Sequence, residues 1–153
     1  RLAIYYAPDE NSELDVFGRC WLGWDPFLGK EISKKYRKNF LNFDNFVVGP
    51  KKYGFHGTLK APFRLKKEYT YSDLEKKVYE IAKELQRFDV GKLNLKKIGN
   101  FIALVPEKND KIKYLSNKLV TGLDFLRDEL LEEEILKRNP QTLTLNQKKM
   151  LTN

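Results

Sequence analysis

The stretch Tyr53-Gly-Phe-His-Gly-Thr-Leu-Lys-Ala-Pro-Phe63 predicts a β-strand with two chemically different faces. Side chains alternate between the two faces of a strand, so Phe55, Leu59 and Phe63 point to the same side. The apolar face formed by these three residues belongs in a hydrophobic core. We expect the strand to cover residues 55–65, with its polar positions facing water.

The polar face of this strand carries His56, Thr58 and Lys60. An imidazole titrates near neutral pH and can take or give a proton. A hydroxyl and an ammonium can hold the oxygens of a phosphate group while negative charge develops on them. Gly54 and Gly57 leave room for a ligand near the backbone. The three side chains together therefore predict a site for a phosphate ester, with all three at least partly exposed.

The surroundings of this stretch are strongly basic. The chain has a net charge of +8. The segment from Lys30 to Lys67 contains eleven Lys/Arg residues and two acidic residues, Glu31 and Asp44, so its own net charge is +9. Such a balance favours an anionic partner, although a solvated lysine-rich surface gives the same count. Aromatic residues interleave with the lysines, as in modules that stack nucleic-acid bases: Tyr36, Phe40, Phe43 and Tyr53. A non-catalytic RNA- or phosphate-binding module using residues 30–67 therefore stays open as the alternative.

Composition limits the remaining classes of protein. The 153 residues are the length of one domain, and an apolar fraction of 41% is enough for a hydrophobic core. Cys20 is the one cysteine, so an internal disulfide is excluded, and with one histidine a Cys/His zinc site is excluded as well. We expect no metal and no cofactor. No apolar run is long enough to span a membrane, and we expect a cytoplasmic protein.

The remaining patterns mix strands and helices. Residues 2–7 predict a strand, Ser12 can cap a short helix, and residues 23–29 predict a loop. Residues 30–54 are predicted to be irregular, with Gly49-Pro50 as punctuation. Apolar spacing predicts a helix over residues 72–85, with Ser72 and Glu75 as its capping box. Further along, the patterns predict a hairpin with its turn at Gly99-Asn100, a helix carrying Ile112, Leu115 and Leu119, a helix ending near Asn139-Pro140, and a last helix capped by Thr144. An antiparallel hairpin among helices favours an α+β fold with antiparallel sheets.

His56-Gly-Thr58 matches the His-x-Thr signature of the two-histidine (2H) phosphoesterases. Four stretches resemble the branch of that superfamily encoded in phosphonate-utilisation operons: Ala3-Ile-Tyr-Tyr-Ala-Pro8, Trp21-Leu-Gly23, residues 53–65 and Phe101-Ile-Ala-Leu-Val-Pro106. The resemblance implies two similar lobes facing a cleft, each with one His-x-Thr/Ser motif. It also implies metal-free hydrolysis of cyclic phosphodiesters, with one histidine as general base and the other as general acid.

The resemblance assigns catalysis to His56 and Thr58. Lys60 fits the pattern of the branch, and Tyr5 and Arg64 are further candidates for substrate binding. The implied substrate is a small phosphorylated sugar or nucleotide in phosphonate metabolism. RNA is the second candidate partner.

The second motif is missing, because His56 is the one histidine of the chain. We therefore expect residues 1–153 to be a single domain or the truncated N-terminal portion of a bilobal phosphoesterase. On this interpretation the intact protein is a hydrolase, and the 153-residue chain alone has little activity.

Overall fold

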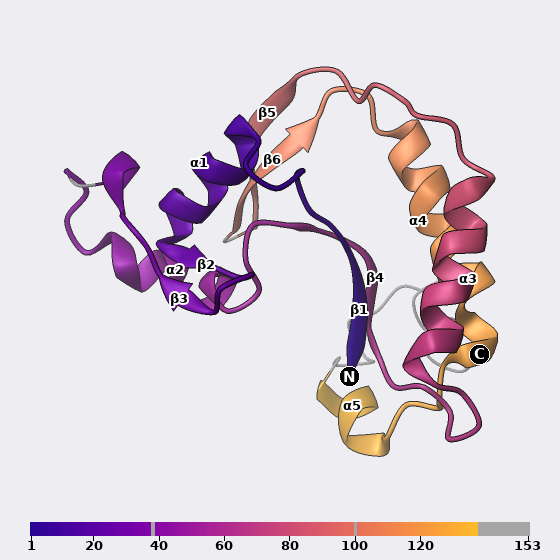
Figure 1. The fold of residues 1–153 in the computed structure, drawn as a ribbon. Helices are drawn as coiled ribbons and strands as arrows, with labels where there is room; N and C mark the ends of the chain where they lie inside the picture. Colours follow the sequence, from indigo (N-terminus) through magenta and orange to yellow (C-terminus); the bar gives the residue numbers. More distant parts are fainter. Residues whose placement is uncertain (38, 100, 138–153) are drawn as a thin grey trace. The chain divides into compact units, whose positions relative to one another are not determined.

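The computed structural model describes residues 1–37, 39–99 and 101–137. Short strands and helices follow one another along the chain (Figure 1). Strand β2 (Trp24–Asp25) pairs antiparallel with β3 (Lys30–Glu31), and β5 (Leu93–Ile98) pairs antiparallel with β6 (Phe101–Pro106). The predicted α+β class is therefore confirmed. The chain divides into two compact units, one formed by Ala3–Ala61 and the other by Arg1–Leu2 together with the residues from Pro62 onward.

The unit Ala3–Ala61 is built around helix α1 and the strand that follows His56. Strand β4 pairs with β1 in a two-stranded sheet, and a small β2–β3 hairpin follows α1. In chain order the elements are β1 (Leu2–Tyr6), α1 (Glu13–Leu22), β2 (Trp24–Asp25), β3 (Lys30–Glu31), the 3₁₀ turn η1 (Lys35–Arg37), α2 (Phe43–Lys51) and β4 (Gly57–Phe63).

Helix α1 begins and ends where the sequence predicts. The Ser12 side chain accepts a hydrogen bond from the Asp15 backbone N–H, and Gly23 ends the helix in the left-handed conformation at φ 69°. Gly18 lies against Phe55, because a Cβ on this glycine would come within 2.3 Å of the Phe55 ring. The helix therefore needs glycine at this position to hold the residue that precedes His56.

A buried ion cluster fixes the loop after α1. Arg19 forms ion pairs with Asp15 at 2.8 Å and with Asp25 at 2.7 Å. The other oxygen of Asp25 accepts the backbone N–H groups of Phe27 and Leu28. The Leu28 N–H contributes most to lowering the pKa of the Asp25 carboxyl, and the Arg19 guanidinium adds to it. Residues 23–29, predicted as a plain loop, thus form a hairpin organised by one carboxylate.

Helix α2 is absent from the sequence-based prediction, which treated residues 30–54 as irregular. The Gly49-Pro50 pair suggested punctuation, yet both residues lie inside the helix. Val47 is buried, with 4% of its surface exposed. Val47 is the one buried residue of α2, so its packing stabilises the helix despite the unfavourable local signals.

The second unit holds a helix pair and a hairpin. Helices α3 and α4 lie side by side (Figure 1) and contact each other, and their apolar core comprises Leu74, Ile81, Leu119, Leu123 and Leu126. The elements in chain order are α3 (Tyr71–Lys83), β5 (Leu93–Ile98), β6 (Phe101–Pro106), α4 (Asp110–Gly122), η2 (Asp124–Leu126) and α5 (Glu132–Lys137).

The predicted hairpin is confirmed, with Ile98 opposite Phe101 at its turn. The cap of α3 differs from the prediction: Thr70 and Asp73 form the capping box in place of Ser72 and Glu75. The predicted helix end at Asn139-Pro140 and the helix capped by Thr144 lie outside the described residues. No helix in the described part of the chain has the length and apolar character needed to cross a membrane.

Candidate functional site

His56 lies in the turn between α2 and β4, directly before the strand and not within it. The turn depends on Gly54, which is buried and adopts a left-handed conformation at φ 75°. The carbonyl oxygen of Gly54 lies 2.9 Å from Nδ1 of His56. A carbonyl oxygen can only accept, so Nδ1 carries the proton of this hydrogen bond. In the neutral ring, Nε2 therefore keeps a lone pair.

Tyr5 covers the imidazole. The ring centroids of Tyr5 and His56 are 3.9 Å apart with an interplanar angle of 31°, and Tyr53 approaches at 6.3 Å with its edge. Among the described residues, Gly54 is the one hydrogen-bond partner of the imidazole. One nitrogen is thus anchored and one face is covered, which leaves Nε2 as the atom that can exchange a proton with a ligand.

Thr58 and Lys60 do not share an exposed face. Thr58 is exposed, two residues beyond His56 on β4. Lys60, predicted to be exposed, has 4% of its surface accessible. Leu59, predicted to be buried, is half-buried.

The alternation fails because the buried positions of β4 are Lys60 and Phe63, three residues apart, where a regular strand alternates every two. Pro62 lies between them. Its fixed φ and missing N–H favour an irregular strand.

Arg64 is held by acidic residues. Its guanidinium lies 2.5 Å from Oε2 of Glu134 and 2.5 Å from the Glu129 carbonyl oxygen, with Asp128 at 3.8 Å. The hydrogen bond from Arg64 is the main cause of the lowered pKa of the Glu134 carboxyl. A phosphate that approached Arg64 would compete with these partners. Asp128 and Glu134 are more than sixty residues from Arg64 in the sequence, so these ion pairs could not be predicted from the sequence.

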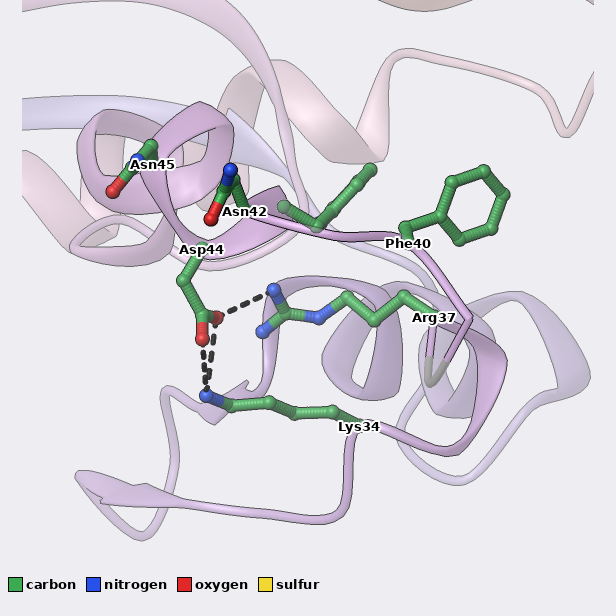
Figure 2. A pocket seen from close by; sticks show the side chains of 7 residues that line it. Lys34, Arg37, Phe40, Asn42, Asp44 and Asn45 are labelled. Carbon is green, nitrogen blue, oxygen red and sulfur yellow. Dashed lines mark hydrogen bonds and ion pairs between the residues drawn. The ribbon is translucent and has the colours of Figure 1, made fainter.

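Sequence analysis missed two features. One is the Gly54 carbonyl, for which the closely spaced Gly54-Phe-His56 was the available signal. The other is a pocket lined by residues of η1, of the start of α2 and of the segments that adjoin them (Figure 2): Lys34, Arg37, Phe40, Asn42, Phe43, Asp44 and Asn45. Within residues 1–37, 39–99 and 101–137, no group of three or more His, Cys, Asp or Glu side chains is placed to hold a metal ion.

Gly54→Ala should destabilise the protein by about 1–2 kcal/mol, because a residue with a Cβ is strained in the left-handed conformation. The new Cβ would also lie 2.9 Å from Cγ of Pro26. Gly57→Ala is the matched control, since a Cβ at Gly57 meets nothing within 4 Å. Denaturant unfolding measures both. Equal midpoints for the two variants would contradict a constrained turn before His56.

Comparison with known proteins gives a family and two relatives. The family described as "Protein of unknown function (DUF1045)" matches residues 58–153. A protein of Janthinobacterium sp. (strain Marseille), named "Ribose 1,5-bisphosphate phosphokinase PhnN", is 28% identical over 154 residues, which cover 99% of this chain and 34% of the relative. A protein of the same name from Laribacter hongkongensis (strain HLHK9) is 27% identical over 127 residues, which cover 82% of this chain and 30% of the relative.

The chain thus spans about a third of the length of the curated relatives it matches. No solved structure matches it. Since the matched region from residue 58 to residue 153 is more than half of the sequence, the chain belongs to the DUF1045 family of proteins of unknown function.

Proposed function

We propose that this chain is the part of a metal-independent phosphoesterase that carries the first His-x-Thr motif. The observation that carries the proposal is the imidazole of His56, which is hydrogen-bonded to the Gly54 carbonyl at 2.9 Å and packs against the tilted ring of Tyr5 at a centroid distance of 3.9 Å. This arrangement presents Nε2 for proton transfer, with the exposed hydroxyl of Thr58 on the adjoining strand. An anchored imidazole beside a hydroxyl suits the hydrolysis of a phosphate ester.

The proposed reaction opens a cyclic phosphodiester. Water attacks phosphorus and one ring P–O bond breaks, so a base must take a proton from the water and an acid must give one to the leaving oxygen. His56 serves as one of these groups through Nε2, and the Thr58 hydroxyl donates a hydrogen bond to a non-bridging oxygen. The second group comes from a second motif in the remainder of a bilobal full-length protein.

The proposed substrate is a small phosphorylated sugar, with a ribosyl cyclic phosphate as the leading candidate. Two relatives whose name specifies ribose 1,5-bisphosphate support a phosphorylated ribose, and their PhnN name supports a place in phosphonate metabolism. The phosphokinase activity in that name is not proposed for this chain. Its sequence contains no Gly-x-x-x-x-Gly-Lys-Ser/Thr loop of the kind that cradles nucleotide phosphates in many kinases.

We propose different roles in substrate binding for Tyr5 and Lys60. The proposed role of Tyr5 is to orient the imidazole, through a ring whose centroid lies 3.9 Å from that of His56. Lys60 is buried, so its proposed contribution is made from within β4 and not as a flexible surface contact. Arg64 would bind phosphate only by exchanging its acidic partners for the substrate.

Hydrolysis of a ribosyl cyclic phosphate by the full-length gene product should survive EDTA and show a bell-shaped pH profile. The reason is that one group acts unprotonated and the other protonated, and neither is a metal-bound water. Steady-state kinetics with and without chelator measure this. A 2′,3′-cyclic nucleotide is the comparison substrate. Loss of activity with EDTA that a divalent metal restores would refute the metal-free mechanism.

A further inference from the structure

The pocket between η1 and α2 has a volume of about 500 Å³ and is lined by cations, amides and aromatic rings. Figure 2 shows the Lys34 and Arg37 side chains converging on the Asp44 carboxylate. The Lys34 ammonium lies 3.0 Å from both oxygens of Asp44, and Nη1 of Arg37 lies 2.6 Å from one of them. Two cations and one anion leave the pocket with a net positive charge.

Arg37 is a buried cation whose carboxylate partner is exposed. Its side chain is 2% exposed, whereas the side chain of Asp44 is 64% exposed. Besides Asp44, the guanidinium donates to the Leu22 carbonyl oxygen at 3.1 Å, and within the described part of the chain its Nε is buried without a partner. Burying a charge is costly unless it is well paired. A carboxylate that stands largely in water is a weak counter-ion for such a group.

The start of α2 adds further positive potential. Asn42 precedes the helix in a left-handed conformation at φ 57°, and its side chain makes no capping hydrogen bond. The first N–H groups of a helix lack partners within it, and they carry the positive end of the helix dipole. Asn42 and Asn45 also bring side-chain amides to the pocket, and amides can donate to an anion.

We infer that this pocket binds the phosphate group of a phosphate monoester, which displaces the Asp44 carboxylate from Lys34 and Arg37. The Asp44 side chain is 64% exposed, so water can solvate the carboxylate once it is released, and both cations are then paired with the incoming anion. A phosphate monoester carries a charge of about −1.5 to −2 and three acceptor oxygens, so it satisfies two cations better than one carboxylate does. The low pKa of Asp44, caused first by the hydrogen bond from Lys34 and then by that from Arg37, fits a carboxylate held in the place of such an anion. The inference is independent of the proposed function, because no residue of the His56 motif lines this pocket.

The test uses calorimetric titration of the full-length gene product with ribose 5-phosphate, and with ribose as the uncharged control. Asp44→Asn should bind ribose 5-phosphate about tenfold more tightly than the wild type, because the competing charge is gone. Lys34→Met should bind it about tenfold more weakly. Lys34 is partly exposed, so its replacement should leave the fold intact. The matched control is Lys35→Met, which removes a neighbouring lysine that lies over the Tyr36 ring and does not line the pocket.

Three outcomes would overturn the inference. They are an unchanged or weaker affinity in Asp44→Asn, an equal effect of Lys34→Met and Lys35→Met, and loss of binding in His56→Asn, which would place the probe at the His56 site. Binding that persists in His56→Asn and responds to Asp44 and Lys34 would support the pocket even if hydrolysis is never observed.

Discussion

Replacing His56 with asparagine in the full-length gene product should lower turnover of a ribosyl cyclic phosphate by about 10²- to 10⁴-fold. An asparagine amide can still donate to the Gly54 carbonyl, as Nδ1 does at 2.9 Å. It has no group that titrates in place of Nε2, so proton transfer is lost while the anchor is kept. In the proposed mechanism other groups bind the substrate phosphate, so KM should change much less than kcat.

Thermal unfolding provides the control for His56→Asn, since within the described part of the chain the half-buried ring makes one hydrogen bond and one close ring contact. A melting temperature near that of the wild type would show that the kinetic loss is chemical. The 153-residue chain alone gives the baseline, and with one histidine it should have little activity. Unchanged turnover in His56→Asn would remove His56 from the mechanism. Vigorous hydrolysis by the 153-residue chain, abolished by His56→Asn, would mean that a second copy supplies the second group.

The sequence suggested which residues form the candidate site, but it did not predict their geometry. His56 and Thr58 could be singled out from their side-chain chemistry and their spacing on a strand. The hydrogen bond that selects the tautomer of His56 depends on the left-handed backbone of Gly54, which no spacing rule specifies. The contact with Tyr5 pairs residues fifty-one positions apart, and it depends on which strands meet. Lys60 was misjudged because a strict alternation was assumed through a strand that contains Pro62.

The net charge of a segment likewise did not predict the electrostatics of the folded protein. The basic balance of residues 30–67 is real, but the sum does not show which cations are already paired. Lys51 is hydrogen-bonded to Glu31, and Lys34 and Arg37 share Asp44. The two acids of the basic segment are thus bound by three of its cations. What distinguishes the η1–α2 pocket is therefore not an excess of lysine but a buried arginine with an exposed counter-ion, and only the fold reveals that difference.

Element prediction failed where tertiary contacts decide. The α3 and hairpin signals were strong because apolar spacing and turn residues agreed with each other. Helix α2 carries Gly49 and Pro50, so local signals argued against it, and the burial of Val47 prevailed. The consequence for function is direct, because α2 contributes to the pocket and leads into the turn that holds His56.

Thr58→Val should lower turnover of the full-length gene product by about 10²-fold or more while leaving its stability nearly unchanged. Valine keeps the shape and strand preference of threonine, and Thr58 is exposed on β4, so we expect the free energy of unfolding to change by less than about 0.5 kcal/mol. Turnover falls because the hydroxyl hydrogen bond to a non-bridging oxygen strengthens as charge develops in the transition state. Kinetics and denaturant unfolding of the same preparations separate the two effects.

Two further variants make the Thr58 prediction specific. Thr58→Ser keeps the hydroxyl and should retain most of the turnover, whereas a role of the methyl group in packing would make serine as damaging as valine. Thr121→Val removes a hydroxyl that donates to the Asn117 carbonyl on α4, outside the proposed site, and should leave turnover unchanged. If Thr58→Val and Thr121→Val are both fully active, the His-x-Thr spacing has no catalytic meaning in this protein. His56 would then act without its hydroxyl partner or not act at all, and the proposed phosphoesterase would lose its second residue.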